Sequence, residues 1–347
     1  MTKRSNMALA LPLIAAIAAI GAVTRPFGKR EMPSLSGATA WLNTQPLTAA
    51  DLKGKVVLVE FWTYTCINWR RTLPYVRAWA ERYKDKGLVV IGVSTPEFSF
   101  EKDINNVQRA LKEMNMGFPI AIDNNYGVWR AFDNEYWPAL YFIDAKGHIR
   151  HHQFGEGDYE GSEKVIQQLL TEAGAKNVPT DLSPVNPNGA ELAADPNTLG
   201  SGETYTGYGR TQNFSSPDGG VYDKPHVYTT PEHLQLNQWA LAGDWTLREE
   251  AATLNKAGGR ITYRFHARDV NFILGPVKPG DAVRFRVLID GHAPGTAHGV
   301  DVDAQGNGKV NEQGMYQLIR QPGPIIDRDV TIEFLDPGVQ GFDFTFG

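Results

Sequence analysis

Cysteine is the scarcest reactive residue in this sequence, with one copy, Cys66, among 347 residues. A single thiol excludes an internal disulfide framework, and in an exported protein an odd cysteine indicates a reactive thiol or an intermolecular bond. The chain also lacks an excess of either charge, because 34 Lys and Arg residues against 39 Asp and Glu residues leave a net charge of −5. This mildly acidic balance gives no electrostatic basis for binding nucleic acid.

Sequence patterns typical of metal-binding sites are equally scarce. The histidines show no ligand spacing, and His151 and His152 are adjacent in an expected strand, so their rings point to opposite faces. Residues 301–312 resemble a calcium-binding loop only in part, because Gln305 and Gly308 depart from its pattern and the flanks read as strands. We therefore expect no metal and no cofactor.

One long apolar run is present, at residues 7–23, and it follows Lys3 and Arg4. This pattern predicts an export signal. The run is about 17 residues long, at the lower limit for a membrane-spanning helix, so an uncleaved anchor in the inner membrane is the alternative to cleavage. In both cases we expect the folded part to be periplasmic or otherwise extracytoplasmic.

The stretch 56–74 is the one around which the rest of the chain is organised. Residues 56–61 are apolar and β-branched, which predicts a buried strand, and a helix is expected from Ile67 onward. Cys66 lies at the junction, where the N–H groups and macrodipole of a helix N-terminus favour a thiolate. We expect a lowered thiol pKa and a reactive nucleophile; the alternative is a buried, inert cysteine.

The remaining pattern predicts an α/β part followed by an all-β part. The α/β part is expected to contain strands at 88–94, 118–122, 139–143 and 149–154 and helices at 104–116, 126–132 and 162–173. Residues 174–202 are rich in Pro, Asn, Asp and Gly, which predicts a linker. Short alternating strands follow, typical of an antiparallel β-sandwich or jelly roll, at 260–266, 270–274, 282–289, 309–310, 315–319 and 330–334.

Several of these segments resemble a known family. Glu60, Cys66 and Pro74, together with residues 136–142 (YWPALYF), resemble the redox centre and the cis-proline loop of the thioredoxin superfamily. The segments WTYTCINW, ETYTGYGRTQNF and NQWALAGDW extend the resemblance to redoxins of the AhpC/TSA type, and to the soluble C-terminal part of DipZ-type cytochrome c biogenesis proteins. The resemblance implies an α/β thioredoxin fold with a redoxin-type βα insertion, followed by a β-sandwich like a carbohydrate-binding module.

The expected domains follow from the pattern and the resemblance together. They are a signal peptide or membrane anchor (1–30), a thioredoxin-like domain (31–173), a linker (174–202) and a β-sandwich domain (203–347).

The resemblance also implies roles for individual residues. Cys66 would be the nucleophile, and Glu60, placed where thioredoxins carry a buried acid, would exchange protons with it. Pro138 would follow a cis peptide bond, with Trp137 lining the site. The other residues expected to contact a bound client are Trp62, Thr63, Tyr64 and Trp69; the alternative is that the aromatic ones are simply core.

One position departs from the Cys-x-x-Cys pattern of the family, because Trp69 stands in place of the second cysteine. We therefore expect an exported thiol oxidoreductase that uses Cys66 alone, acts on protein disulfides or sulfenic acids, and needs an external thiol reductant.

Two alternatives stay open. Thr63-x-x-Cys66 matches the core of the peroxiredoxin motif, which favours a one-Cys thiol peroxidase. The other alternative is a redox-silent protein that binds an extended peptide beside Pro138. Its sandwich would bind cell-wall glycan through exposed aromatic residues, for which the candidates are Tyr205, Tyr208, Trp239 and Trp245.

Overall fold

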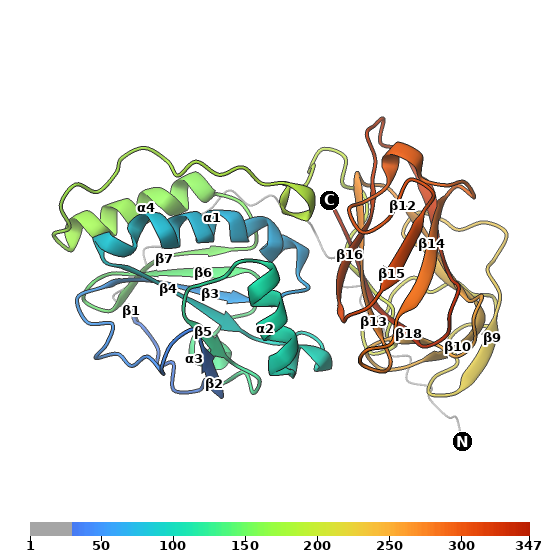
Figure 1. Cartoon of the computed structure of the whole chain (residues 1–347), viewed down its shortest axis with the longest axis horizontal. Coiled ribbons are helices and arrows are strands. Elements are labelled where there is room, and N and C mark those ends of the chain that lie inside the picture. Colours follow the sequence, from blue (N-terminus) through green and yellow to red (C-terminus); the bar gives the residue numbers. More distant parts are fainter. Residues whose placement is uncertain (1–29) are drawn as a thin grey trace, which may run out of the picture.

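The computed structural model describes residues 30–347, and Figure 1 shows two parts side by side. The expected export segment, residues 7–23, lies outside the described residues. Within residues 30–347 no helix is long and apolar enough to cross a membrane.

The first part has seven strands, four α-helices and short 3-10 turns. In chain order they are β1 (Arg30–Glu31), β2 (Ala40–Leu42), β3 (Val56–Trp62), α1 (Ile67–Tyr83), η1 (Lys84–Lys86), β4 (Leu88–Ser94), η2 (Ser99–Lys102), α2 (Ile104–Glu113), β5 (Ile120–Ile122), α3 (Gly127–Ala131), β6 (Ala139–Ile143), β7 (His148–Phe154) and α4 (Tyr159–Glu172).

Strand β3 is the centre of the first sheet, whose order is β1-β7-β6-β3-β4-β5-β2. It runs parallel to β4 and antiparallel to β6, and all of its residues are buried. Its side chains alternate between two cores: Leu58 and Trp62 pack with α1, α2 and α4, whereas Val59 and Phe61 pack with α3. Figure 1 shows α1 and α4 on one face of the sheet and α3 on the other. Burial on both faces explains the continuous apolar run in the sequence.

The second part is an all-β sandwich. After η3 (Gly189–Glu191), its elements are β8 (Thr204–Tyr205), β9 (Pro225–Tyr228), β10 (Trp239–Leu247), β11 (Ala252–Leu254), β12 (Arg260–Phe265), β13 (Asp269–Pro276), β14 (Val283–Ile289), η4 (Gly295–Ala297), β15 (Asn307–Val310), β16 (Gly314–Arg320), β17 (Arg328–Phe334) and β18 (Val339–Phe346). One sheet has the order β10-β12-β17-β14-β15, and the other has β10-β11-β18-β13-β16, with β9 beside β10 and β8 beside β18.

Strand β10 belongs to both sheets and links them. Its first half pairs with β12, and from Gly243 onward it pairs with β9. Gly243 has a φ of 96°, and a Cβ at this position would lie 2.9 Å from the Cα of Gly259. A side chain here would therefore be strained and would collide with the neighbouring backbone, so glycine allows the strand to bend from one sheet into the other.

The predicted fold classes of both parts are confirmed. The edges of elements differ from the prediction: the helix expected from Ser162 begins a turn earlier at Tyr159, after Asp158 in the left-handed region (φ 45°). Strand β18 was not predicted, because Gly341 and Asp343 interrupt its apolar pattern and have low β-propensity. Its seven-residue pairing with β13, which is distant in sequence, stabilises it in the fold.

The segment 174–202, expected to be a linker, lies against the first part along much of its length. The backbone N–H of Ser183 donates to the Glu163 carboxylate of α4 at 2.9 Å. Glu191 of η3 accepts from Arg77 of α1 at 2.6 Å, and Arg320 of β16 donates to the carbonyl of Gly189 at 2.7 Å. The segment therefore bridges the two parts instead of spanning open solvent.

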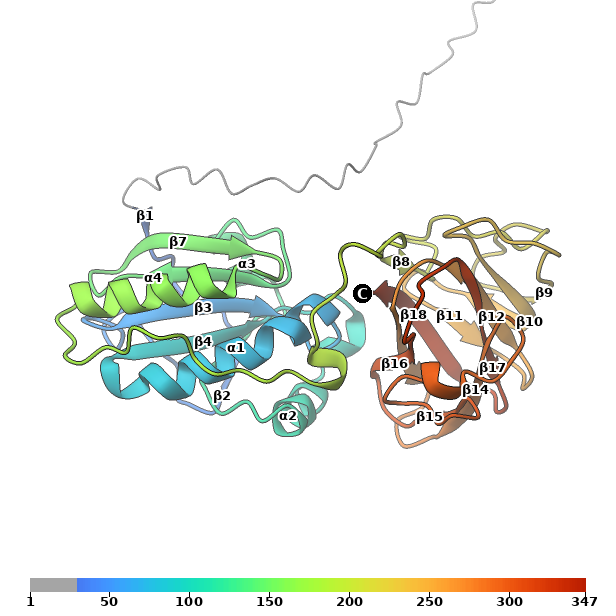
Figure 2. The ribbon, with the colours of Figure 1, turned by 90° about the horizontal axis from the view of Figure 1, so that it is seen from above.

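The two parts share an apolar interface. Phe98 and Phe100, around η2, meet Phe342 of β18 with ring centroids 5.4 and 4.8 Å apart. Ile273 and Met315 of the sandwich belong to the same buried cluster as the face of the first sheet that α1 covers. Figure 2 shows the end of β18 directed at the start of α1. The β-sandwich is therefore packed against the end of the first part that carries the start of α1.

The domain boundaries stay a proposal, which proteolysis can test. We expect the first cut of a limited digestion to fall within residues 174–202, because this segment is the longest stretch without regular strands or helices between the two parts. Glu191→Ala should raise the cutting rate about two- to fivefold, because it removes the ion pair between Glu191 and Arg77. Mass spectrometry of the first fragments measures both effects. Glu172→Ala on α4 is the matched control with an unchanged rate; a first cut elsewhere contradicts the boundary.

Candidate functional site

Cys66 occupies the N-cap position of α1, one turn after the end of β3. Its backbone is extended (φ −68°, ψ 116°), and its carbonyl accepts the first helical hydrogen bond from the N–H of Arg70 at 3.0 Å. The residue is half-buried, and it packs against the apolar cluster beneath α1. This placement results from the buried strand β3, which ends at Trp62, and from the helix that begins at Ile67.

The loop before β6 lies against the sulfur. The Cys66 thiol donates to the carbonyl oxygen of Trp137, with Sγ and oxygen 3.8 Å apart. The bond from Trp137 to Pro138 is cis, as the resemblance implied. The Trp137 indole donates to the carbonyl of Thr95 at 3.1 Å and packs on Trp129, which fixes the loop. The structure thus brings Cys66, Trp137 and Pro138 together.

The environment of the thiol differs from the prediction. Burial raises the pKa of Cys66, and the carboxylates of Glu97 and Glu203 raise it further. The backbone N–H groups of Trp69 and Asn68, at the start of α1, act in the opposite direction but do not outweigh burial. The predicted lowering of the thiol pKa is therefore wrong for this structure, and the resting thiol is protonated at neutral pH.

Glu60 lies in the middle of β3 with no exposed surface. Burial raises its pKa to about 8, as expected for a carboxyl group in an apolar strand, while the Trp69 side chain acts weakly in the opposite direction. Neither carboxyl oxygen has a hydrogen-bond partner among residues 30–347. Glu60 is therefore mostly uncharged at pH 7 and could release or accept a proton near pH 8.

Trp62 and Trp69 lie in the core and not at the surface of the site. Both are completely buried, and their rings stack with centroids 4.5 Å apart. The position of Trp69 three residues after Cys66 would allow its side chain to cover the sulfur, but the side chain packs in the buried cluster beneath α1. For these two residues the structure favours the alternative that they are core, so a client bound at Cys66 would not reach them.

Thr63 and Tyr64 are also buried, and the loop that carries them is held by an acid that the sequence did not reveal. Glu101 of η2 accepts from the hydroxyl of Thr65 at 2.5 Å and from the N–H of Glu97 at 2.6 Å. Burial raises the pKa of Glu101 to about 7, and the nearby hydroxyl of Thr63 opposes the increase. The Thr63 side chain thus interacts with a buried carboxyl group. No local pattern could predict the contact between Glu101 and Thr65, because it joins residues 36 positions apart.

The β-sandwich contributes a second group of residues beside the site. Glu97 accepts from the Tyr205 hydroxyl at 2.6 Å and pairs with Arg210 at 2.8 Å. The Arg210 guanidinium lies 3.7 Å from the centroid of the Tyr205 ring, in a cation–π contact. Because Glu97 acts on the Cys66 thiol, the sandwich shapes the electrostatics of the site. The two contacts of Glu97 join residues more than 100 positions apart, so the sequence alone could not predict them.

The aromatic candidates for glycan binding are placed differently from one another. Trp239 and Trp245 are fully buried in the core of the sandwich, so they cannot contact a sugar. Tyr208 is half-buried and packs on the exposed Tyr222 with centroids 4.7 Å apart, whereas Tyr205 holds Glu97 as described above. Trp239 and Trp245, which were expected among exposed turns, are therefore part of the core of the sandwich.

Together these features define the class of the protein. A lone thiol at the start of the helix that follows the central strand, opposite a cis-proline loop, is the arrangement of a thioredoxin-like redox protein. Residues 29–152 match the AhpC/TSA family, and residues 201–347 match the family described as thioredoxin like C-terminal domain. The chain therefore belongs to the thioredoxin-like AhpC/TSA family of thiol-disulfide oxidoreductases.

Two curated relatives support this assignment. The chain is 43% identical to protein DipZ of Mycobacterium bovis over 249 residues, which is 70% of this chain and 35% of DipZ, so it spans about a third of that relative. It is 31% identical to the thiol-disulfide oxidoreductase YkuV of Bacillus subtilis over 144 residues, which is 42% of this chain and 97% of YkuV. A solved thioredoxin-like protein in its oxidised form has 32% identity and a TM-score of 0.39, and covers 42% of this chain and 97% of its own.

The raised pKa of Cys66 predicts how its reactivity changes with pH. The alkylation rate of the native thiol should keep rising between pH 8 and 10, because the thiolate becomes abundant only above the ordinary value of about 8.5. Stopped-flow alkylation with iodoacetamide measures it. The same chain in denaturant is the matched control, since it carries the same single thiol without burial, and its rate should level off near pH 9 to 10. A native rate that is already constant from pH 7 would contradict the raised pKa.

Proposed function

We propose that this protein is an exported thiol oxidoreductase that acts through Cys66 alone. The observation that carries the proposal is the half-buried sulfur at the start of α1, 3.8 Å from the carbonyl oxygen of Trp137 and beside the cis Pro138. An extended client chain laid along this loop would bring its own sulfur next to Cys66. Clients would be proteins that carry a disulfide or a sulfenic acid.

The reaction consists of three exchanges. The Cys66 thiol loses its proton, and its thiolate attacks one sulfur of the client disulfide, forming a mixed disulfide and releasing the other client sulfur as a thiolate. An external thiol then attacks the Cys66 sulfur of the mixed disulfide and releases the second client sulfur as a thiolate. A second external thiol attacks the new mixed disulfide, which returns Cys66 to its reduced state and releases an external disulfide. One disulfide of the client is reduced to two thiols, and two external thiols become a disulfide. Because its pKa is about 8, Glu60 is mostly protonated at neutral pH. It would then donate a proton to the departing thiolate.

The location and the remaining partners belong to this proposal. Export rests on the apolar run at residues 7–23 behind Lys3 and Arg4, which would either be cleaved or anchor the chain in the inner membrane. A cell-wall glycan partner would now depend on the Tyr208 and Tyr222 pair alone. The one-Cys peroxidase is a weaker alternative, because the Thr63 hydroxyl interacts with the buried carboxyl group of Glu101.

One observation favours a second candidate, a redox-silent protein that binds extended peptides. The thiol pKa is raised, so few molecules carry the attacking thiolate at neutral pH. In a redox-silent protein the loop at Trp137 and Pro138 would bind a client, and Cys66 would only pack against that client. The two candidates differ in whether a mixed disulfide forms.

Removing the thiol distinguishes the thiol oxidoreductase from the redox-silent candidate. Cys66→Ser should abolish all disulfide reduction, because the chain contains no other thiol. Peptide binding measured by fluorescence anisotropy should persist in this variant, since the loop at Pro138 is intact. Asn68→Ser, at an exposed neighbouring position, is the matched control and should retain activity. Reduction that survives in Cys66→Ser would refute the role of Cys66, and a wild type that reduces nothing would favour the redox-silent candidate.

Restoring a second thiol tests the mechanism. Trp69→Cys should convert a trapped mixed disulfide into a rapidly resolved one, because residues three apart lie on one side of the first helical turn. Non-reducing gels after incubation with a disulfide client should show an accumulated adduct in the wild type and little in the variant.

The variant also loses a large buried side chain. The substitution should cost about 3–5 kcal/mol of stability, so the melting temperature must be measured beside it. Trp69→Ser creates a similar cavity without a thiol, and its adduct should persist as in the wild type. Equal adduct lifetimes in the Cys and Ser variants would contradict intramolecular resolution.

A further inference from the structure

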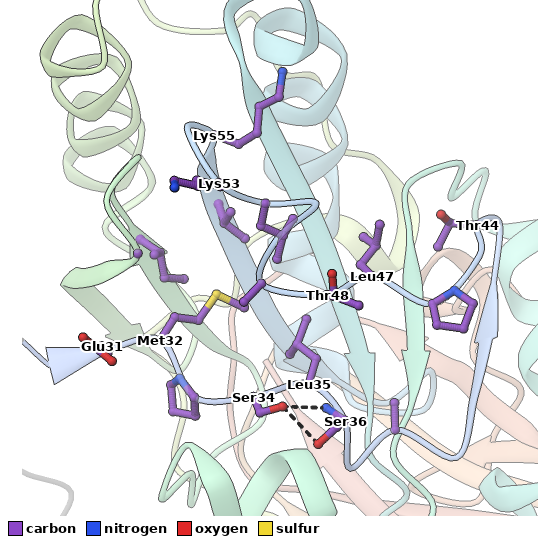
Figure 3. Close-up of a pocket in the computed structure, with 18 of the residues that line it drawn as sticks. Glu31, Met32, Ser34, Leu35, Ser36, Thr44, Leu47, Thr48, Lys53 and Lys55 are labelled. Atoms are coloured by element: carbon purple, nitrogen blue, oxygen red, sulfur yellow. Dashed lines mark hydrogen bonds between the residues drawn. The ribbon is translucent and has the colours of Figure 1, made fainter.

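A large pocket lies at the opposite end of β3 from Cys66. It has a volume of about 1120 Å³, and it lies between the N-terminal segment 31–55, the start of β3 and the turn between β6 and β7. Figure 3 shows Met32, Leu35 and Leu47 around the hollow, with Lys53 and Lys55 along its upper rim. The proposed redox reaction uses none of these residues.

The wall of this pocket is the edge of an apolar core. Leu35, Leu52, Val57 and Ile143 are almost fully buried beneath it. The half-buried apolar side chains packed on that core face the pocket, and they are Met32, Ala38, Trp41 and Leu47. Apolar surface in a concave site favours a ligand with an extended hydrocarbon portion.

Positive charge gathers at one end of the same pocket. Lys53 and Lys55 flank Gly54, whose N–H donates to the carbonyl of Ala145 at 3.1 Å, and this contact brings the turn carrying Lys146 alongside. All three lysines are exposed, and none has an acidic partner among residues 30–347. Three cations that lack partners beside an apolar hollow form a complementary site for an anionic head group.

The acidic residues near the pocket do not cancel this charge. The Asp144 carboxylate accepts from the N–H groups of Lys146 and His148 and pairs with Arg150 at 3.2 Å. These partners already compensate its negative charge. Glu31 is exposed and lies at the left of Figure 3, below Lys53. The Asp51 carboxylate accepts from the N–H and the hydroxyl of Thr48 at 2.8 and 2.6 Å. At the end of the pocket that carries Lys53 and Lys55, the lysines therefore outnumber the carboxylates that lack partners.

We propose that this pocket binds a single-chain amphiphile with a carboxylate head, such as a fatty acid of 12 to 16 carbons. The hydrocarbon chain lies along Met32, Trp41 and Leu47, and the carboxylate meets the lysine rim. Each methylene that leaves water should improve affinity about fourfold. This site is a second binding function, separate from the thiol chemistry at the other end of the sheet.

Fluorescence quenching tests the proposal on the full-length chain. A bromine atom quenches an indole that it touches, and Trp41 lines the pocket. Titration with 12-bromododecanoic acid, below its micelle concentration, should quench a fraction of the fluorescence, and Trp41→Phe should remove that fraction. The neutral 12-bromododecanol should bind at least tenfold more weakly. Equal binding of acid and alcohol, or quenching that survives in Trp41→Phe, would overturn the proposal.

Lysine variants locate the head group. Each of Lys53→Glu, Lys55→Glu and Lys146→Glu should weaken binding of the acid about two- to fivefold, and the triple variant should weaken it at least tenfold while leaving the alcohol unaffected. Lys309→Glu in β15 is the matched control without effect. The alkylation rate of Cys66 should be the same in all variants, which shows that the fold is intact.

Two other outcomes would replace the proposed ligand. If neither probe quenches Trp41 in the full-length chain, the pocket is closed to amphiphiles or occupied by another part of the chain, and the proposal fails. If brominated phosphatidylglycerol in vesicles quenches Trp41 whereas the free acid does not, the pocket is a contact with a lipid bilayer and not a site for a single-chain carboxylate.

Discussion

Burial of β3 on both faces is the constraint on which the rest of the structure depends. Leu58 and Trp62 anchor the side that α1 and α4 cover, and Val59 and Phe61 anchor the side that α3 covers. Because every residue of the strand is buried, its register with β4 and β6 cannot shift without turning a complete set of apolar side chains to the wrong face. The position of Cys66 follows from this register, since the thiol lies four residues beyond the end of the strand.

The same packing determines the chemistry of the thiol. A helix N-terminus favours a thiolate, but the surrounding aromatic and apolar side chains withdraw Cys66 from water, and desolvation has the larger effect. Trp69 adds to this environment, because it fills the core beneath the first turn of α1 by stacking on Trp62. An indole at this position carries no thiol and increases the apolar volume below Cys66.

The β-sandwich contributes residues that lie beside the site. Phe342 inserts beside Phe98 and Phe100, while Tyr205 and Arg210 hold Glu97 close enough to act on the thiol. Aromatic stacking and a charge-assisted hydrogen bond at one interface fix the relative positions of the two parts more firmly than the connecting segment alone could. The opposite end of the first sheet is free of the sandwich, and there the apolar edge remains open as the lysine-rimmed pocket.

The amino-acid sequence by itself determined the two fold classes, the strand-to-helix junction at Cys66, the raised pKa of Glu60 and, through the resemblance, the cis bond before Pro138. These features depend on local patterns of apolar residues or on motifs of adjacent residues, which can be read along the chain. Only the tertiary structure decided the sign of the pKa shift of Cys66, because its burial and the nearby charges of Glu97 and Glu203 both depend on groups that are distant in sequence. It also decided that Trp62, Trp69, Trp239 and Trp245 are core, that β18 forms, and that Glu101 holds the loop before the thiol, since each depends on partners that only the fold brings near.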